Sequence, residues 1–202
     1  AFEYYKKSAD GGNIESYDKL ANMYFPGIGT KQDFKKAFEW YKKSVYGGYT
    51  NAQSTIGLMY YKGIGTKKDY KKAFKWIEKS ANEGNADVYN ILGIMYYNGE
   101  GTNKDYTKAF EWYEKSANEG DIRSQYSLGN MYYCGEGTNQ DYTKAFEWFE
   151  KSTNGDCIYA YNYLANMYYM GEGTEKDYKK AFEWYEKGAN RYDAVAQNML
   201  GN

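Results

Sequence analysis

A block of five residues recurs every 36 positions along this chain, and this fixed period constrains the fold more than any other feature. The block reads Ala-Phe-Glu-Trp-Tyr at residues 37–41, and every tryptophan of the protein occupies the same place in it. The copies carry Trp40, Trp76, Trp112, Trp148 and Trp184. A period of this size indicates a stack of similar supersecondary units, each contacting only its neighbours, and argues against one central core.

Residues 49–84 illustrate one repeat, and their apolar periodicity predicts a first helix. Small and apolar side chains follow a spacing of about 3.6 residues. They are Ala52, Ile56, Met59 and Tyr60. The neighbouring Gly57 is replaced only by glycine or alanine in the other repeats, which indicates a close helix crossing. We expect this helix to end at Gly63, because glycine adopts the left-handed turn without steric cost.

A second helix is predicted over residues 70–81, with Asp69 as its N-cap and Gly84 as its end. Glutamate and lysine recur on its polar side in the favourable i, i+4 order, which predicts a solvated outer face. These pairs are Glu39–Lys43, Glu111–Lys115, Glu147–Lys151 and Glu183–Lys187. The tryptophans and one set of tyrosines keep constant places in the repeat and are expected in the core. The tyrosines are Tyr24, Tyr60, Tyr96, Tyr132 and Tyr168.

Composition excludes several functional classes. The formal net charge is −1, from 26 basic and 27 acidic residues, whereas a nucleic-acid-binding protein usually carries a basic excess. No apolar run reaches the roughly 18 residues of a membrane span. Histidine is absent, which removes the commonest general base and metal ligand. We therefore expect no enzyme activity, no cofactor, no metal, no nucleic-acid partner and no membrane partner.

Two apparent catalytic motifs have structural explanations. The G-x-G loops, such as residues 99–101, occur in every repeat and follow no predicted strand, so they do not indicate a phosphate site. Residues 16–19 match the S-x-x-K pattern of penicillin-recognising enzymes, but no accompanying K-T-G or S-D-N element occurs. We interpret both motifs as parts of the repeat.

The two cysteines, Cys134 and Cys157, occupy different places in the repeat. Parallel stacking of equivalent helices puts them about 20 Å apart, whereas a disulfide requires Cα atoms within about 7 Å. We expect free thiols that are buried as small hydrophobic side chains. Free thiols weakly favour a reducing compartment such as the cytoplasm.

The repeat resembles the Sel1-like repeat, a relative of the tetratricopeptide repeat, over the whole chain. The third full copy carries the matching motifs at residues 92–96, 99–102, 105–106, 108–110 and 112–113. A tetratricopeptide repeat has a 34-residue period and a tryptophan in its first helix, unlike this chain. The resemblance implies a right-handed α-solenoid of antiparallel helix pairs that acts as an adaptor for other proteins. Secreted bacterial members carry a cysteine pair in each repeat, and this chain lacks these pairs.

The repeat boundaries predict one solenoid over residues 1–202. We expect a half repeat at 1–12, five full repeats at 13–192 and a half repeat at 193–202. Neither end has a polar capping repeat, which predicts a fragment of a longer array.

Three departures from the repeat carry local predictions. Pro26 should end its helix early. Asp156 replaces the closing glycine, with Gly155 one place earlier, and should shift that turn by one residue. Tyr192 stands at the same place in the last copy, and its turn should differ most from the others, because left-handed geometry is costly for tyrosine.

A second face of the first helix varies between repeats, and we expect it to contact the partner. Its residues are Asp18, Asn22, Ser54, Leu58, Asn90, Ile94, Tyr126, Asn130, Asn162 and Asn166. First helices line the concave side of solenoids of this type, which forms an extended groove. Each asparagine amide donates and accepts, so it can pair with the backbone of an extended peptide, and the apolar members can add selectivity.

The predicted function is therefore a scaffold that binds an extended segment of another protein. An alternative is self-association, in which open repeat ends stack head to tail. RNA binding by tyrosine stacking is a third hypothesis, which the near-neutral charge disfavours.

Overall fold

The computed structural model describes residues 1–155 and 157–200, with the side chains of 51 and 192–200 left aside. These residues form helices and no strand, and equivalent helices start 36 residues apart, as at Tyr70, Tyr106 and Tyr142. The chain divides into two compact units, residues 1–104 and 105–202. The predicted all-α fold of helix pairs with a 36-residue period is confirmed.

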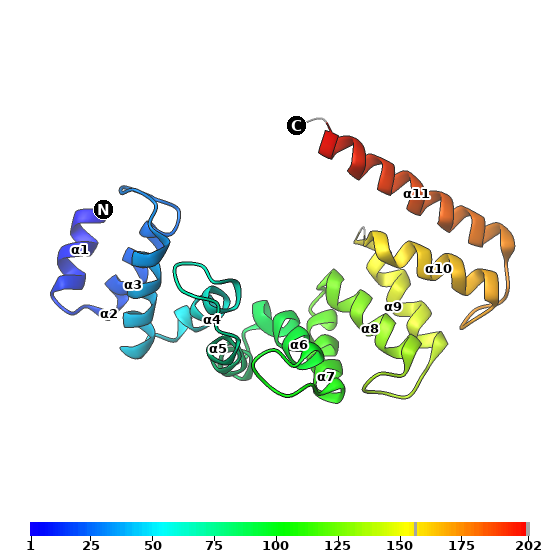
Figure 1. Ribbon diagram of the computed structural model, residues 1–202, viewed down its shortest axis with the longest axis horizontal. Coiled ribbons are helices and arrows are strands. Elements are labelled where there is room, and N and C mark those ends of the chain that lie inside the picture. Colours follow the sequence, from blue (N-terminus) through cyan, green and yellow to red (C-terminus); the bar gives the residue numbers. More distant parts are fainter. Residues whose placement is uncertain (156, 201–202) are drawn as a thin grey trace. The chain divides into compact units, whose positions relative to one another are not determined.

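Short loops join the helices of each unit into successive hairpins (Figure 1). The first unit contains α1 (Phe2–Asp10), α2 (Ile14–Tyr24), α3 (Phe34–Tyr46), α4 (Gln53–Lys62), α5 (Tyr70–Asn82) and α6 (Tyr89–Asn98). Short 3-10 turns, η1 (Thr50–Ala52) and η2 (Ala86–Val88), precede α4 and α6. The second unit contains α7 (Tyr106–Asn118), α8 (Ile122–Cys134), α9 (Tyr142–Asn154), α10 (Ile158–Met170) and α11 (Tyr178–Leu200). Even-numbered helices are first helices of repeats, and odd-numbered helices are second helices.

The second helices begin at an aspartate, as predicted. Asp69 Oδ1 accepts a hydrogen bond of 3.0 Å from the backbone N–H of Lys72, which satisfies one free donor of the first turn. The same cap occurs at Asp33, Asp105, Asp141 and Asp177. At Asp33 and Asp69 this bond to the ionised form lowers the pKa of the carboxyl group.

Glycines shape the loop between the two helices of each repeat. Gly63 ends α4 with a left-handed φ of 72°, as predicted. The second glycine of the loop approaches the preceding repeat closely. A Cβ on Gly173 would lie 2.1 Å from the backbone oxygen of Tyr142, at the start of α9, and Gly137 has the same relation to Tyr106. Only glycine fits here, so the G-x-G loops serve the stacking of successive repeats.

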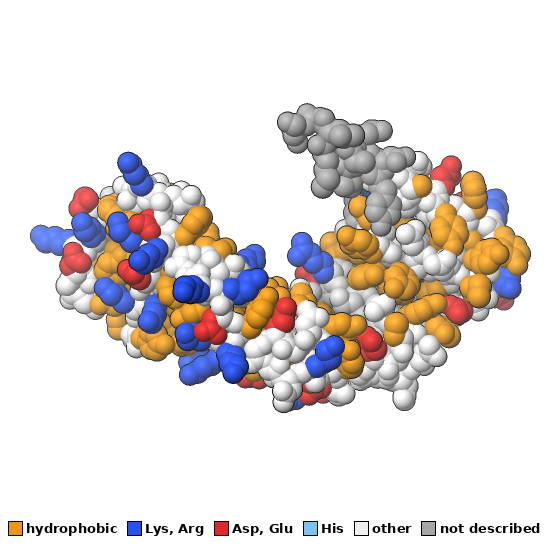
Figure 2. All heavy atoms as spheres, in the orientation of Figure 1, with side chains coloured by type: hydrophobic (Ala, Val, Ile, Leu, Met, Phe, Trp, Pro, Cys, Tyr) orange, Lys and Arg blue, Asp and Glu red, His pale blue; other side chains and the backbone are white. Residues whose placement is uncertain are grey.

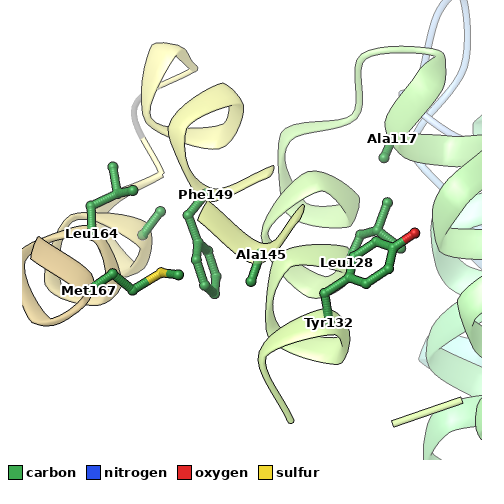
Figure 3. Close-up of a cluster of buried hydrophobic side chains, with 8 residues drawn as sticks. Ala117, Leu128, Tyr132, Ala145, Phe149, Leu164 and Met167 are labelled. Atoms are coloured by element: carbon green, nitrogen blue, oxygen red, sulfur yellow. The ribbon is translucent and has the colours of Figure 1, made fainter. Parts of the chain in front are cut away.

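The helix crossing inside each repeat is as close as the sequence predicts. A Cβ on Gly57 would lie 2.7 Å from Cγ1 of Ile77, and one on Gly129 would lie 2.8 Å from Cδ1 of Phe149. Figure 3 shows Phe149 pointing from α9 toward Leu164 and Met167 of α10. Phe149 is completely buried. Side chains of α8, α9 and α10 thus form one continuous core.

The tyrosines predicted in the core are buried, and each joins two repeats. Tyr96 meets the ring of Phe74 from the preceding second helix edge to face, with centroids 5.2 Å apart. The same geometry pairs Phe2 with Tyr24, Phe38 with Tyr60, Phe110 with Tyr132 and Phe146 with Tyr168. Such pairs add about 0.5–1.5 kcal/mol to area burial.

The prediction for the tryptophans is confirmed only in part, because all five are half-buried and lie at the border of the core. Trp148 and Trp184 pack against the core cluster of the second unit. A lysine three residues later covers the ring instead of pairing with the glutamate. Lys43 Nζ lies 4.0 Å from the Trp40 ring centroid, and Lys151 Nζ lies 3.9 Å from that of Trp148. Among the described residues no ion pair joins the predicted Glu–Lys partners. Each exposed cation–π contact is worth about 0.5–1 kcal/mol.

The structure answers two of the three local predictions. Helix α2 ends at Tyr24, two residues earlier in the repeat than the other first helices, such as α8, which ends at Cys134. The early end predicted for the helix before Pro26 is confirmed. The helix backbone continues through Tyr192 to Leu200 without a turn, so this repeat boundary does differ most from the others. Asp156 lies outside the described residues.

Both cysteines are free, as predicted, but the prediction of burial is wrong for Cys134, which is exposed. Cys157 is half-buried. Partial burial raises the pKa of both thiols, so neither is activated as a nucleophile.

Candidate binding surface on the first helices

None of the residues predicted to contact a partner is buried, and we call this set the first-helix surface. In the first unit it comprises Asp18 and Asn22 on α2, Ser54 and Leu58 on α4, and Asn90 and Ile94 on α6. In the second unit it comprises Tyr126 and Asn130 on α8, and Asn162 and Asn166 on α10. Asn22, Asn162 and Asn166 are exposed, and the others are half-buried.

Three asparagines of this surface are oriented by tyrosine hydroxyls. Tyr41 donates to Asn22 Oδ1 over 2.8 Å, and Tyr163 donates to Asn130 Oδ1 over 3.0 Å. The Tyr185 hydroxyl donates to Asn166 Oδ1 in the same way. Each bond engages the amide oxygen and thereby turns the NH₂ group away from the tyrosine. In these three asparagines the amide oxygen is thus engaged within the chain, and the NH₂ group is the part of the amide that points away from the tyrosine.

The donor of Asn22 is already used within α2. Its Nδ2 donates to the backbone oxygen and to Oδ2 of Asp18, both over 2.9 Å. Burial raises the pKa of Asp18, while Lys19 and the bond from Asn22 oppose this shift. Burial, followed by the charge of Asp18, raises the pKa of Tyr41 to about 12, so its hydroxyl stays a proton donor at neutral pH.

In the second unit the Nδ2 groups of Asn130 and Asn166 have no partner among the described residues. They occupy equivalent places one repeat apart, on α8 and α10. The second unit therefore presents two oriented and unused amide donors, which is the strongest polar feature of the first-helix surface.

Tyr163, which donates to Asn130, belongs to an aromatic cluster in the second unit. Tyr163 stacks on Phe149 with centroids 4.5 Å apart and meets Tyr126 at 5.9 Å. The pKa of Tyr126 is raised well above its ordinary value, first by burial and then by Tyr163, which is hydrogen-bonded to it. Tyr159 meets Tyr126 at 5.9 Å and is 64% exposed. The cluster thus extends from the core to the surface.

Helix α10 has no charged residue among its 13, although one side of it faces solvent. Its exposed large side chains are Tyr159, Tyr169 and Met170. In Figure 2, hydrophobic side chains gather over the second unit. Interface cores are depleted of charge and enriched in tyrosine and methionine. The sequence analysis missed these three residues and Tyr163, although the absence of charge from residues 158–170 could have indicated them.

The motifs set aside in the sequence have structural roles. Ser16 is buried, and its hydroxyl donates to Ser8 Oγ over 2.8 Å. In the G-x-G loops, Glu100 accepts a hydrogen bond from Tyr61 and Glu172 accepts one from Tyr133, each over 2.8 Å. Within the described chain, no group of three or more potential metal ligands occurs. None of its helices is long and apolar enough to span a membrane.

Comparison with known proteins identifies the repeat. The model of the Sel1 repeat matches residues 1–13, 14–49, 50–85, 86–121, 122–157 and 158–193. The chain belongs to the Sel1 repeat family. Sel1 repeat proteins generally mediate protein–protein interactions and are generally non-enzymatic scaffolds. A search of curated proteins found no match.

Two solved structures of Sel1 repeat proteins are similar to this chain over most of its length. The first is c5321, a protective antigen of uropathogenic Escherichia coli strains, with a TM-score of 0.83 and 32% identity over 98% of this chain. The chain spans 43% of the length of c5321. The second is a Sel1 repeat protein from Oxalobacter formigenes, with a TM-score of 0.78 and 30% identity. That match covers 88% of this chain and 73% of the other.

Proposed function

We propose that this Sel1 repeat protein is an adaptor whose first-helix surface binds an extended segment of another protein. The observation that supports this most directly is the pair of oriented amide donors on Asn130 and Asn166. In an extended segment, backbone carbonyl oxygens recur at regular intervals and remain unpaired until the segment binds. Two donors one repeat apart can bond to two carbonyl oxygens of such a backbone and thereby fix its orientation.

The uncharged side of α10 supplies the apolar part of the proposed contact. Tyr159, Tyr169 and Met170 offer large contact area, and tyrosine loses little conformational entropy on binding. The partner segment is therefore uncharged where it crosses α10 and carries an aliphatic or aromatic side chain. Leu58 and Ile94 provide similar, smaller apolar contacts in the first unit.

The test uses peptides selected from a random-sequence library against the intact chain. Replacing Asn130 and Asn166 together by alanine removes two hydrogen bonds of about 0.5–1.5 kcal/mol each. Affinity measured by calorimetry should fall about tenfold. The melting temperature should fall only slightly, because Asn166 is exposed and Asn130 is half-buried, and each change removes one hydrogen bond from a tyrosine hydroxyl.

The matched control replaces Asn82 and Asn118, which are exposed at the ends of α5 and α7. This double variant should bind the selected peptides as the original chain does. Equal affinity of the Asn130/Asn166 variant and the control variant would contradict the proposed role of the amides.

Self-association is a second candidate, favoured by the exposed apolar side of α11. Phe182 is 67% exposed, whereas its equivalent Phe146 packs on Tyr168 of α10 with centroids 5.2 Å apart. Another first helix could cover Phe182 in the same way. If so, sedimentation velocity should show concentration-dependent dimers that Phe182→Glu abolishes. A monomer at all concentrations eliminates this candidate.

A further inference from the structure

Charge is distributed unevenly along this chain, although its net charge is close to zero. Residues 1–104 carry 16 basic and 11 acidic side chains, whereas residues 105–202 carry 10 basic and 16 acidic ones. All the basic residues of the first unit are lysines. In Figure 2, basic side chains gather over the first unit. The near-neutral total therefore hides a basic unit.

The basic excess of the first unit is concentrated in α5 and the loop that joins it to α4. Residues 62–79 contain seven lysines and two carboxylates. The equivalent residues 98–115 contain three lysines and four carboxylates, and residues 134–151 contain two lysines and four carboxylates. We call the seven lysines, which are all exposed, the lysine surface. They are Lys62, Lys67, Lys68, Lys71, Lys72, Lys75 and Lys79.

The fold does not require the lysine surface. Helices α7 and α9 occupy the same place in their repeats, with threonine where α5 has Lys71 and glutamate where it has Lys75. Like charges four residues apart on a helix destabilise it, and Lys71, Lys75 and Lys79 follow this spacing along α5. A local arrangement that weakens its own helix is expected where it serves a function.

Four of these lysines form no ion pair, hydrogen bond or ring contact with a described residue. They are Lys62, Lys67, Lys71 and Lys75. The two carboxylates of the segment are engaged elsewhere. Asp69 caps α5 and pairs with Lys72 at 3.0 Å. Glu78 accepts a hydrogen bond of 2.7 Å from the hydroxyl of Tyr96. The four free lysines are therefore available to an anionic partner.

The spacing of the lysines on α5 suits an extended acidic segment. Four residues of a helix rise about 6 Å. Alternate residues of an extended chain point to one side and are about 6.6–6.8 Å apart. Carboxylates at alternate positions can therefore follow Lys71, Lys75 and Lys79. The first unit has no arginine, the residue best suited to paired phosphate contacts and to stacking, and this favours carboxylates over a nucleic acid.

We propose that the lysine surface binds an extended segment of a partner protein that carries aspartate or glutamate at every second position. Lys71 and Lys75 supply the main contacts, since Lys79 shares its charge with Glu83 at 3.9 Å. Lys62 and Lys67 attract the segment from the adjoining loop. The inference goes beyond the proposed function and does not rest on it, because the lysine surface shares no residue with the first-helix surface.

The test is a titration of the ¹⁵N-labelled chain at low salt with a hexapeptide, Glu-Ser-Glu-Ser-Glu-Ser, blocked at both ends. Backbone amide resonances of residues 62–79 should shift saturably. The control peptide Gln-Ser-Gln-Ser-Gln-Ser should bind at least about tenfold more weakly, because its side chains carry no charge. Equal shifts with both peptides, or shifts confined to resonances outside residues 62–79, overturn the proposal.

The same titration distinguishes a protein segment from other polyanions. A single-stranded oligothymidylate and phosphatidylserine vesicles should each bind more weakly than the glutamate peptide. Tighter binding of either one at residues 62–79 overturns the assignment to a protein segment.

Two double variants separate the lysine surface from the overall charge of the chain. Lys71→Thr with Lys75→Glu gives α5 the residues of α7 and α9 and should weaken binding of the glutamate peptide at least about tenfold. Lys6→Thr with Lys7→Glu makes the same change of charge on α1, where both lysines are exposed, and should leave binding unchanged. Equal affinity of the two variants overturns the proposal.

Circular dichroism checks that both variants fold. If the α5 variant does not fold, Lys62→Asn with Lys67→Asn decides, because the next repeat has asparagine at both places. This variant should weaken binding severalfold, and unchanged affinity in the folded chain overturns the proposal. Replacement of Asn130 and Asn166 by alanine should leave binding of the glutamate peptide unchanged, so the proposed function is tested separately.

Discussion

Replacing Gly173 with alanine should lower the free energy of unfolding of the second unit by about 3–4 kcal/mol. Two costs add together. Gly173 has a φ of +69°, and a non-glycine residue held there costs about 1–2 kcal/mol. Its Cβ would lie 2.1 Å from the backbone oxygen of Tyr142, so α9 and the loop must separate, which costs about 1–3 kcal/mol as overpacking. Urea unfolding followed by circular dichroism measures the loss.

Gly120→Ala provides the matched control for this prediction. Gly120 also has a positive φ, of +92°, but a Cβ there meets no atom within 4 Å. This variant should lose only the conformational part, about 1–2 kcal/mol. If the two variants are equally stable, the loop of one repeat does not hold the preceding repeat through close backbone contact.

Replacing Phe149 with alanine should cost about 3–5 kcal/mol, the range found for large-to-alanine changes in cores. Phe149 is completely buried and fills the space above Gly129. Its ring also stacks on Tyr163, which donates the hydrogen bond that orients Asn130. Urea unfolding of the variant measures the stability loss, and binding of selected peptides should weaken at the same time.

The control for this change is Phe182→Ala, which removes the same side chain from the neighbouring second helix. Because Phe182 is 67% exposed, its loss should cost less than about 1 kcal/mol. A loss at Phe149 no larger than that at Phe182 would mean that the second unit does not depend on the contact between α8, α9 and α10.

The fold could be predicted from the sequence because a repeat restates its constraints in every copy. Gly57 and its counterparts vary only between glycine and alanine, and this restriction indicated the close crossing with Ile77 and Phe149. Asp69 and its equivalents indicated the start of each second helix. Local patterns of this kind act within one repeat and do not depend on distant residues.

The positions of the tryptophans could not be predicted in the same way. Their constant place in the repeat is equally compatible with the core and with its border. A lysine three residues later covers each ring from outside, as Lys43 covers Trp40. The i, i+4 spacing favours an ion pair between this lysine and the glutamate. In the structure the lysine instead makes a cation–π contact with the tryptophan ring.

The candidate surface was only partly readable from the sequence. Its asparagines stand at one place on the first helix, but the tyrosines that orient them come from two different places in the repeat. Tyr41 and Tyr185 lie on second helices of the same repeats, whereas Tyr163 comes from the next first helix. Phe149 occupies the place in the repeat that Tyr41 and Tyr185 occupy, and it has no hydroxyl to donate. Tyr163 supplies the missing hydrogen bond to Asn130. Such substitution across repeats becomes visible only when side chains are placed in space.

The proposed recognition depends on the amide donors of Asn130 and Asn166, and the side-chain resonances of these residues report on them directly. The ¹⁵N-labelled chain is titrated with a selected peptide while the Nδ2–H₂ signals of all asparagines are followed. The signals of Asn130 and Asn166 should shift saturably and exchange more slowly with solvent, and those of Asn82 and Asn118 should remain unchanged. Saturable binding that leaves the Asn130 and Asn166 signals in place would contradict the proposed recognition.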